Sequence, residues 1–121
     1  MIPYEPRADG SRILLITSAR RKKWIIPKGV IEPGYGAEDS AAKEAVEEAG
    51  VLGLIRTPAL GSYEQSKWGG ICHIEVFLLE ISEVLTKWPE KGLRRRKWFT
   101  RAEAISCVEP SGLKRLLALV P

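Results

Sequence analysis

The sequence has little cysteine and histidine, which limits the metal chemistry that it can support. It contains two cysteines, Cys72 and Cys107, and a single histidine, His73. The cysteines lack a CxxC spacing and have apolar neighbours, so we expect buried, reduced thiols rather than a thiolate metal site. A lone histidine in a strand is more often a half-buried structural residue than a catalytic base. Reduced cysteines are typical of the cytoplasm, where we expect this protein to act.

Export and membrane signals are also lacking. No charged segment followed by an apolar one is found at the start, and no apolar run approaches the roughly 20 residues that cross a bilayer. We therefore expect neither secretion nor membrane insertion. No internal repeat, low-complexity tract or interdomain linker interrupts the 121 residues. With 45% hydrophobic and 28% charged residues, the chain is expected to form one domain, residues 1–121.

The hydrophobic pattern predicts a sheet and three helices. Strands are expected at 12–18, 24–26, 51–65 with an interruption at Pro58, 71–81 and 94–100. Helices are expected from Ala37 to Gly50, from Thr100 or Arg101, and from Ser111 through Val120. The N-terminal edge of the sheet is expected to be short. This order predicts an α+β fold in which the sheet packs between helices.

Three glutamates gather near the end of the helix predicted from Ala37. Glu44, Glu47 and Glu48 stand at i, i+3 and i+4, so a 3.6-residue helix places their side chains in one narrow arc. Each like-charge pair costs a few tenths of a kcal/mol, and the helix dipole near Gly50 favours cations instead. A bound divalent cation would turn this repulsion into attraction. The alternative is a solvated acidic face, which is the commoner origin of such a run.

The loop before this helix is rich in proline and glycine. It contains Pro27-Lys28-Gly29 and Glu32-Pro33-Gly34. Gly29 has no Cβ, so its backbone can approach a ligand closely. A loop, helix and acidic group in this order would suit a metal-bound polyphosphate.

With these spacings, residues 29–51 resemble the box of the Nudix hydrolase family. The positions in register are Gly29, Glu44, Ala45, Glu47, Glu48, Gly50 and Val51. Two positions depart from the box, because Tyr35 stands where it has its first Glu and Lys43 stands where it has Arg. In the family that Glu and Arg pair with each other, so losing both leaves no orphaned charge. The resemblance implies a Nudix α/β/α sandwich with a mixed central sheet between helices.

The same resemblance implies roles for the matching residues. Glu44 and Glu48 are expected to bind divalent metal, Glu47 to act as ligand or base, and the Gly29 carbonyl to complete the coordination. Glu44 and Glu47 are thus the expected catalytic residues. Mg²⁺ or Mn²⁺ is expected, because a group of oxygen ligands suits these ions. Candidates for a base beyond the box are Glu64, Glu75 and Glu90, and the sequence does not decide among them.

Two short clusters account for the positive net charge of +4. They are Arg20, Arg21, Lys22 and Lys23, and Arg94, Arg95, Arg96 and Lys97. Such clusters occur in nucleic-acid footprints, in walls that bind polyphosphates, and most often as plain solvated charge. Since the first cluster and Lys28 precede the box, we expect some of these residues to contact substrate phosphates. The second cluster is left undecided.

Expected substrate contacts are Ser18, Arg20, Lys28 and Tyr35. Residues 16–24 and 82–104 are similar to the diphosphoinositol polyphosphate and dinucleoside polyphosphate hydrolase branch, where basic residues near Ser18 and Arg20 would meet a phosphate-rich substrate. Tyr35 and Trp68 are both placed in loops and could stack on a nucleobase.

Three functions are compatible with these features. The leading hypothesis is a metal-dependent hydrolase that cleaves a phosphoanhydride bond of a small polyphosphorylated molecule or nucleoside diphosphate derivative by water attack. The second is a Nudix-fold binding or regulatory module with little or no turnover, of which Tyr35 and Lys43 would be early signs. The third, a nucleic-acid-binding domain, is disfavoured because no recognised binding motif accompanies the basic clusters. A monomer or a homodimer is expected.

Overall fold

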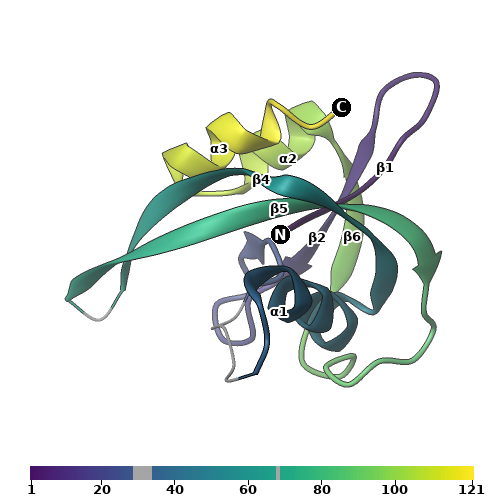
Figure 1. Ribbon diagram of the computed structural model, residues 1–121, viewed down its shortest axis with the longest axis horizontal. Coiled ribbons are helices and arrows are strands. Elements are labelled where there is room, and N and C mark those ends of the chain that lie inside the picture. Colours follow the sequence, from purple (N-terminus) through teal and green to yellow (C-terminus); the bar gives the residue numbers. More distant parts are fainter. Residues whose placement is uncertain (29–33, 68) are drawn as a thin grey trace.

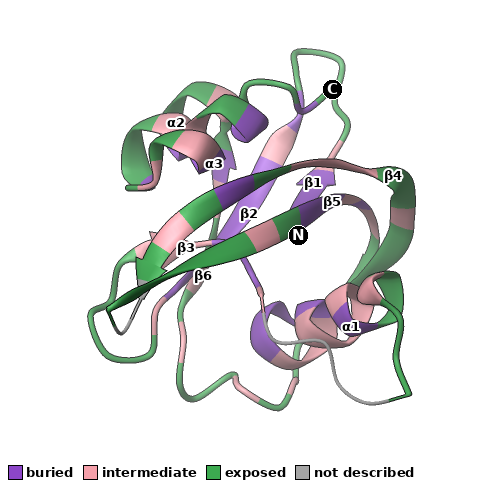
Figure 2. Ribbon diagram, turned by 60° about the vertical axis from the view of Figure 1, so that its left-hand side comes forward, coloured by how far each residue is buried: buried purple, intermediate pink, exposed green. Residues whose placement is uncertain are grey.

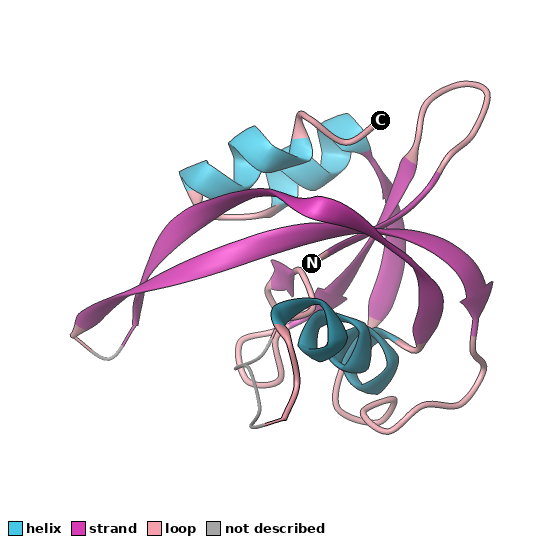
Figure 3. Cartoon of the chain, in the orientation of Figure 1, coloured by secondary structure: helices cyan, strands magenta, loops and turns pink. Residues whose placement is uncertain are grey.

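A mixed six-stranded sheet with helices on both faces forms the core of the computed structural model (Figures 1 and 3). The structure describes residues 1–28, 34–67 and 69–121. The strands are β1 (Ile2–Glu5), β2 (Arg12–Thr17), β3 (Trp24–Ile25), β4 (Val51–Lys67), β5 (Gly70–Val84) and β6 (Arg96–Thr100). The helices are α1 (Ala37–Glu44), the π-helical turn η1 (Ala45–Ala49), α2 (Arg101–Cys107) and α3 (Ser111–Leu117).

The strand order is β3-β2-β1-β5-β4, and β6 also pairs with β2. β1 and β5 are parallel, whereas the other pairs are antiparallel. α1 and η1 cover one face of the sheet, and α2 and α3 cover the other (Figure 1). The expected α/β/α sandwich with a mixed central sheet is therefore confirmed.

Strand β2 shows why the sheet is buried on both faces. Its side chains alternate, so Ile13 and Leu15 pack in the core under α2 and α3, while Leu14 and Ile16 pack in the core under α1 and η1. All four are buried, and β2 forms part of the buried centre of the sheet in Figure 2. A strand buried on both faces reads as a continuous apolar run.

The small side chains of the first helix let it lie close to the sheet. Ala45 and Ala49 are fully buried against the core that contains Phe77 and Leu79. On the opposite face, α2 begins with a capping box in which Thr100 and Glu103 bind each other's backbone N–H groups.

The structure corrects the expected position of the N-terminal strand. β1 is short but is not an edge, because it lies between β2 and β5 and pairs in parallel with β5, Ile2 opposite Leu78. The predicted interruption at Pro58 is found as a shift of register between Arg56 and Gly61 within β4. A second shift lies between Leu52 and Gly53.

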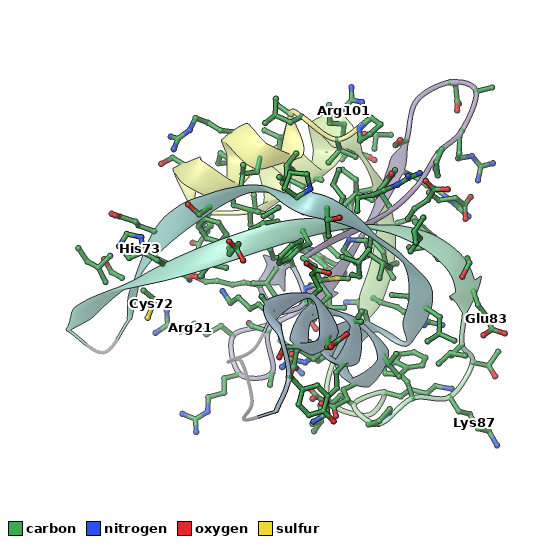
Figure 4. All side chains as sticks on the ribbon, viewed as in Figure 1. Arg21, Cys72, His73, Glu83, Lys87 and Arg101 are labelled. Atoms are coloured by element: carbon green, nitrogen blue, oxygen red, sulfur yellow. The ribbon has the colours of Figure 1, made fainter. Side chains whose placement is uncertain are left out.

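The prediction of buried cysteines is wrong for both residues. Cys72 is exposed because it lies on the part of the β4–β5 hairpin that extends beyond the helices, as Figure 4 shows. Cys107 is exposed at the last position of α2. Apolar neighbours in the sequence did not ensure burial, because no helix covers the end of the hairpin. Within the described residues, no helix has the length and apolarity needed to cross a membrane.

Candidate active site

The acidic centre of the molecule is a pair of carboxyl groups at the junction of α1 and η1. Glu48 is only 5% exposed and its side chain is hydrogen-bonded to that of Glu44. Burial is the main cause that raises the pKa of Glu48 to about 8, and the contact with Glu44 raises it further. A buried carboxyl group in contact with a second carboxyl needs either a proton or a cation to compensate its charge.

Two basic residues flank this pair. The backbone N–H of Lys28 donates to Glu48 Oε1 over 3.4 Å, and Arg94 Nη2 lies 4.0 Å from the same oxygen. Arg94 is held in place by Glu90, whose Oε1 accepts from its Nε at 2.8 Å, and by the Thr17 carbonyl at 3.2 Å. The sequence left the second basic cluster undecided, and the structure places its first member beside the acids.

Arg96 places a positive charge at the end of the helix that carries the acids, where the helix dipole is negative. Its Nη1 donates to the carbonyls of Ala49 and Gly50 at 2.9 and 3.2 Å, so a cation caps the helix end where the dipole favours one. Its guanidinium also stacks 3.8 Å from the centroid of the Trp88 ring. Gly50 permits this packing, because its φ is +66° and a Cβ would lie 2.6 Å from Trp88 Cδ2.

The helix predicted from Ala37 to Gly50 changes from α-helical to π-helical winding where its glutamates lie. A regular α-helix ends at Glu44, and residues 45–49 form a π-helical turn, a feature frequent at functional sites. The segment that follows β5 binds the carbonyls at the end of this turn. The N–H of Glu90 donates to the Glu47 carbonyl at 2.9 Å, and the N–H of Leu85 donates to the Gly50 carbonyl at 2.8 Å. Contacts from a distant part of the chain therefore stabilise the turn that carries Glu48.

The structure does not bring all three glutamates together. Glu47 instead lies 3.7 Å from Lys43, measured from Oε1 to Nζ. The Lys43 ammonium in turn lies 5.3 Å from the centroid of the Tyr35 ring, and Tyr35 is 44% exposed. The two departures from the box therefore contact each other, with Lys43 paired to an acid of the box.

The remaining predicted residues divide into those near the acids and those apart from them. The Ser18 hydroxyl accepts from the Lys23 N–H at 3.1 Å and so closes the turn that carries Arg20, which is exposed. Lys28 Nζ donates to Gln65 Oε1 at 2.7 Å. Gly29 and Trp68 lie outside the described residues.

Of the three candidate bases beyond the box, one lies near the acidic pair. Glu90 contacts Arg94, which reaches Glu48. Glu64 instead pairs with His73 at 3.5 Å, and both are exposed on the β4–β5 hairpin. Glu75 is exposed on β5.

The sequence reasoning missed a small cavity next to Lys28. Its volume is about 30 Å³, and Trp24, Tyr63 and Gln65 are among the residues that line it. Tyr63 is 3% exposed, and its hydroxyl has no hydrogen-bond partner within the described residues. Burial raises the pKa of Tyr63 to about 12, so this hydroxyl stays protonated. No sequence signal marked Tyr63, because a tyrosine in a strand is ordinarily a packing residue.

The donor chemistry of the acidic pair fits a hard divalent ion. Mg²⁺ is typically bound through one or two carboxylates, with waters and substrate phosphates at the other positions. Glu44 and Glu48 would supply those carboxylates. In the part of the chain that the structure describes, no three or more acidic, His or Cys side chains are grouped so as to hold a metal. A pair completed by other oxygen donors is thus the arrangement that these residues allow.

Comparisons with known proteins point to one family. Residues 4–119 match the family model described as NUDIX domain. Nudix hydrolase 16, mitochondrial, from Arabidopsis thaliana is 38% identical over 108 residues, which cover 82% of this chain and 59% of that protein. Diphosphoinositol polyphosphate phosphohydrolase 3-alpha from Mus musculus is 34% identical over 100 residues, which cover 80% of this chain and 60% of that protein.

The chain thus spans less than two thirds of the length of these relatives. Among solved structures, an Ap4A hydrolase from C. elegans has the same fold, with a TM-score of 0.78 and 20% identity. That similarity covers 97% of this chain and 89% of the other. On the match over residues 4–119 and these relatives, the chain belongs to the Nudix family.

Proposed function

We propose that this protein is a metal-dependent hydrolase that cleaves a diphosphate bond of a small, phosphate-rich molecule by attack of water. The observation that carries this proposal is the buried Glu48, which is hydrogen-bonded to Glu44 and flanked by Lys28 and Arg94. An acidic pair beside the Arg94 guanidinium and the Lys28 backbone N–H suits a bound ion together with a bound phosphate.

Hydrolysis of a phosphoanhydride requires an aligned water and compensation of charge on the phosphoryl oxygens. A Mg²⁺ or Mn²⁺ ion held by Glu44 and Glu48, with the Gly29 carbonyl, would supply Lewis-acid stabilisation of those oxygens. Glu48 would hold such an ion as a carboxylate, without its proton. Arg94 offers N–H donors to phosphate oxygens, and Glu47 accepts the proton of the attacking water.

The substrate is proposed to be rich in phosphate. Two similar proteins are named for such molecules, as a diphosphoinositol polyphosphate phosphohydrolase and an Ap4A hydrolase. In this chain, Arg20 on its exposed turn, Lys28 and Tyr35 are the proposed contacts. Ser18 contributes by closing the turn that presents Arg20. A cytoplasmic location stays a prediction, since the names of relatives such as Nudix hydrolase 16 place them in mitochondria.

A substrate panel tests this function directly. Release of phosphate or pyrophosphate would be measured from nucleoside and inositol polyphosphates, with Mg²⁺, with Mn²⁺ and with a chelator. Release that requires the metal supports the proposal. The variant E48Q should lower turnover about 100-fold or more, because a carboxylate that would hold the charge-compensating ion is lost. E83Q, at the exposed far end of β5 (Figure 4), is the matched control and should retain turnover.

The pair formed by Glu47 and Lys43 favours one other function. If Glu47 stays bound to Lys43, the chain would bind a polyphosphate without hydrolysing it. Stabilisation against melting by one of these compounds without product release would indicate such a binding module. Retention on DNA or RNA that falls steeply with salt would instead indicate nucleic-acid binding.

A further inference from the structure

The two positions that depart from the Nudix box form a contact of their own. Lys43 Nζ lies 5.3 Å from the centroid of the Tyr35 ring, within the range of a cation–π interaction. The same ammonium lies 3.7 Å from Glu47 Oε1, and the two side chains of this ion pair are 33% and 34% exposed. Tyr35, just before α1, Lys43 on α1 and Glu47 on η1 thus form a row of contacts.

Glu47 and Glu48 contact different residues of the preceding helical turn. The side chain of Glu48 lies against Glu44, whereas that of Glu47 lies against Lys43. The Glu47 backbone is fixed by the N–H of Glu90, so the Glu47 side chain must move if it is to join the pair.

We propose that Lys43, supported by the Tyr35 ring, is a positioning residue that keeps Glu47 away from the Glu44–Glu48 pair and so weakens divalent metal binding there. The inference rests on the proposed function, in that the ion binds at Glu44 and Glu48. An ammonium group is a compact point charge, so it competes with a metal ion for the same carboxylate. It also adds positive charge near a site that binds a dication.

Metal binding can be measured without turnover. Free Mn²⁺ would be followed by its electron paramagnetic resonance signal during titration, and Mg²⁺ would be tested by competition. K43M keeps the length of the side chain and removes the charge. Since a partly exposed ion pair contributes little, we expect the Kd for Mn²⁺ to fall about two- to fivefold. K43R keeps the charge and should bind Mn²⁺ as the unmodified protein does.

Two further variants separate this effect from general changes of charge. Y35E/K43R restores the acid and the base of the box, so the two introduced side chains can pair with each other and the Kd should fall as in K43M. R7M removes a cation from another partly exposed ion pair, Arg7 with Glu5, in the β1–β2 turn far from α1 (Figures 1 and 2). Its Kd should not change. Melting in a chelator verifies that each variant is folded.

The outcomes distinguish this inference from the proposed function. If the unmodified protein binds no Mn²⁺, or if E48Q binds it equally well, the proposed function fails. If the unmodified protein binds Mn²⁺ but K43M has the same Kd, only the role of Lys43 is overturned. An equal change in R7M or K43R would also contradict it, because the effect would then not depend on the charge at this position.

Discussion

Arg96 offers the sharpest test of how the acidic site is supported. The variant R96M keeps an apolar stem over Trp88 but loses the hydrogen bonds to the carbonyls of Ala49, Gly50 and Leu85. A bond to a charged group contributes about 1.5–3 kcal/mol. Because Nη1 is shared between two carbonyls, we count two such bonds at the lower limit and expect a loss of about 3 kcal/mol.

Urea denaturation measures this loss as a change of midpoint. With about 1–3 kcal/mol per M of urea, the midpoint should fall by about 1–3 M. R95M is the matched control from the same cluster. The Arg95 guanidinium lies 6.0 Å from the Trp24 ring centroid, so we expect a loss below about 1 kcal/mol. If both variants lose the same amount, or R96M loses less than about 1 kcal/mol, Arg96 does not support the end of the helix.

Two further predictions concern residues around the same turn. In a chelator, Glu48 should make the protein less stable as the pH rises from about 4.5 toward about 8, because the folded state holds its proton more tightly than the unfolded state. The free energy of unfolding of E48Q should lack this pH dependence, so the stability of the variant relative to the unmodified protein should increase as the pH rises from about 4.5 toward about 8. If the free energies of unfolding of the two proteins changed equally with pH, the burial argument would be contradicted. G50A should cost about 2–4 kcal/mol, since alanine is strained at a φ of +66° and its Cβ would meet Trp88. A melting temperature within a degree of the unmodified protein would refute that reasoning.

Sequence patterns predicted the parts of the fold that depend on local information. The apolar run at 12–18 predicted strand β2, and the hydrophobic pattern from Ala37 predicted the first helix. The π-helical turn could not be predicted in this way. The carbonyls at its end bind Leu85, Glu90 and Arg96. These residues come only after the whole β4–β5 hairpin in the sequence. Local propensity contains no information about such partners.

The acids of the candidate site were identified from the sequence, but their arrangement was not. Ideal helical spacing placed Glu44, Glu47 and Glu48 in one arc, whereas the structure pairs Glu44 with Glu48 and Glu47 with Lys43. The losses of the family's Glu and Arg were interpreted as coupled, and the structure adds a contact between Tyr35 and Lys43 that the sequence did not predict. The binding roles proposed for Ser18, Arg20 and Lys28 stay predictions.

The second basic cluster illustrates why charge counted along a sequence differs from charge available to a ligand. Side chains alternate along an extended segment, so Arg94 and Arg96 face α1 and η1, whereas Arg95 and Lys97 lie over the rings of Trp24 and Phe99 in the opposite layer. Of the two that face the acids, Arg96 is bound to carbonyls at the end of the helix. Arg94 is the member of this cluster that lies beside the buried carboxyl of Glu48, so a phosphate bound there would gain one cation from four adjacent basic residues.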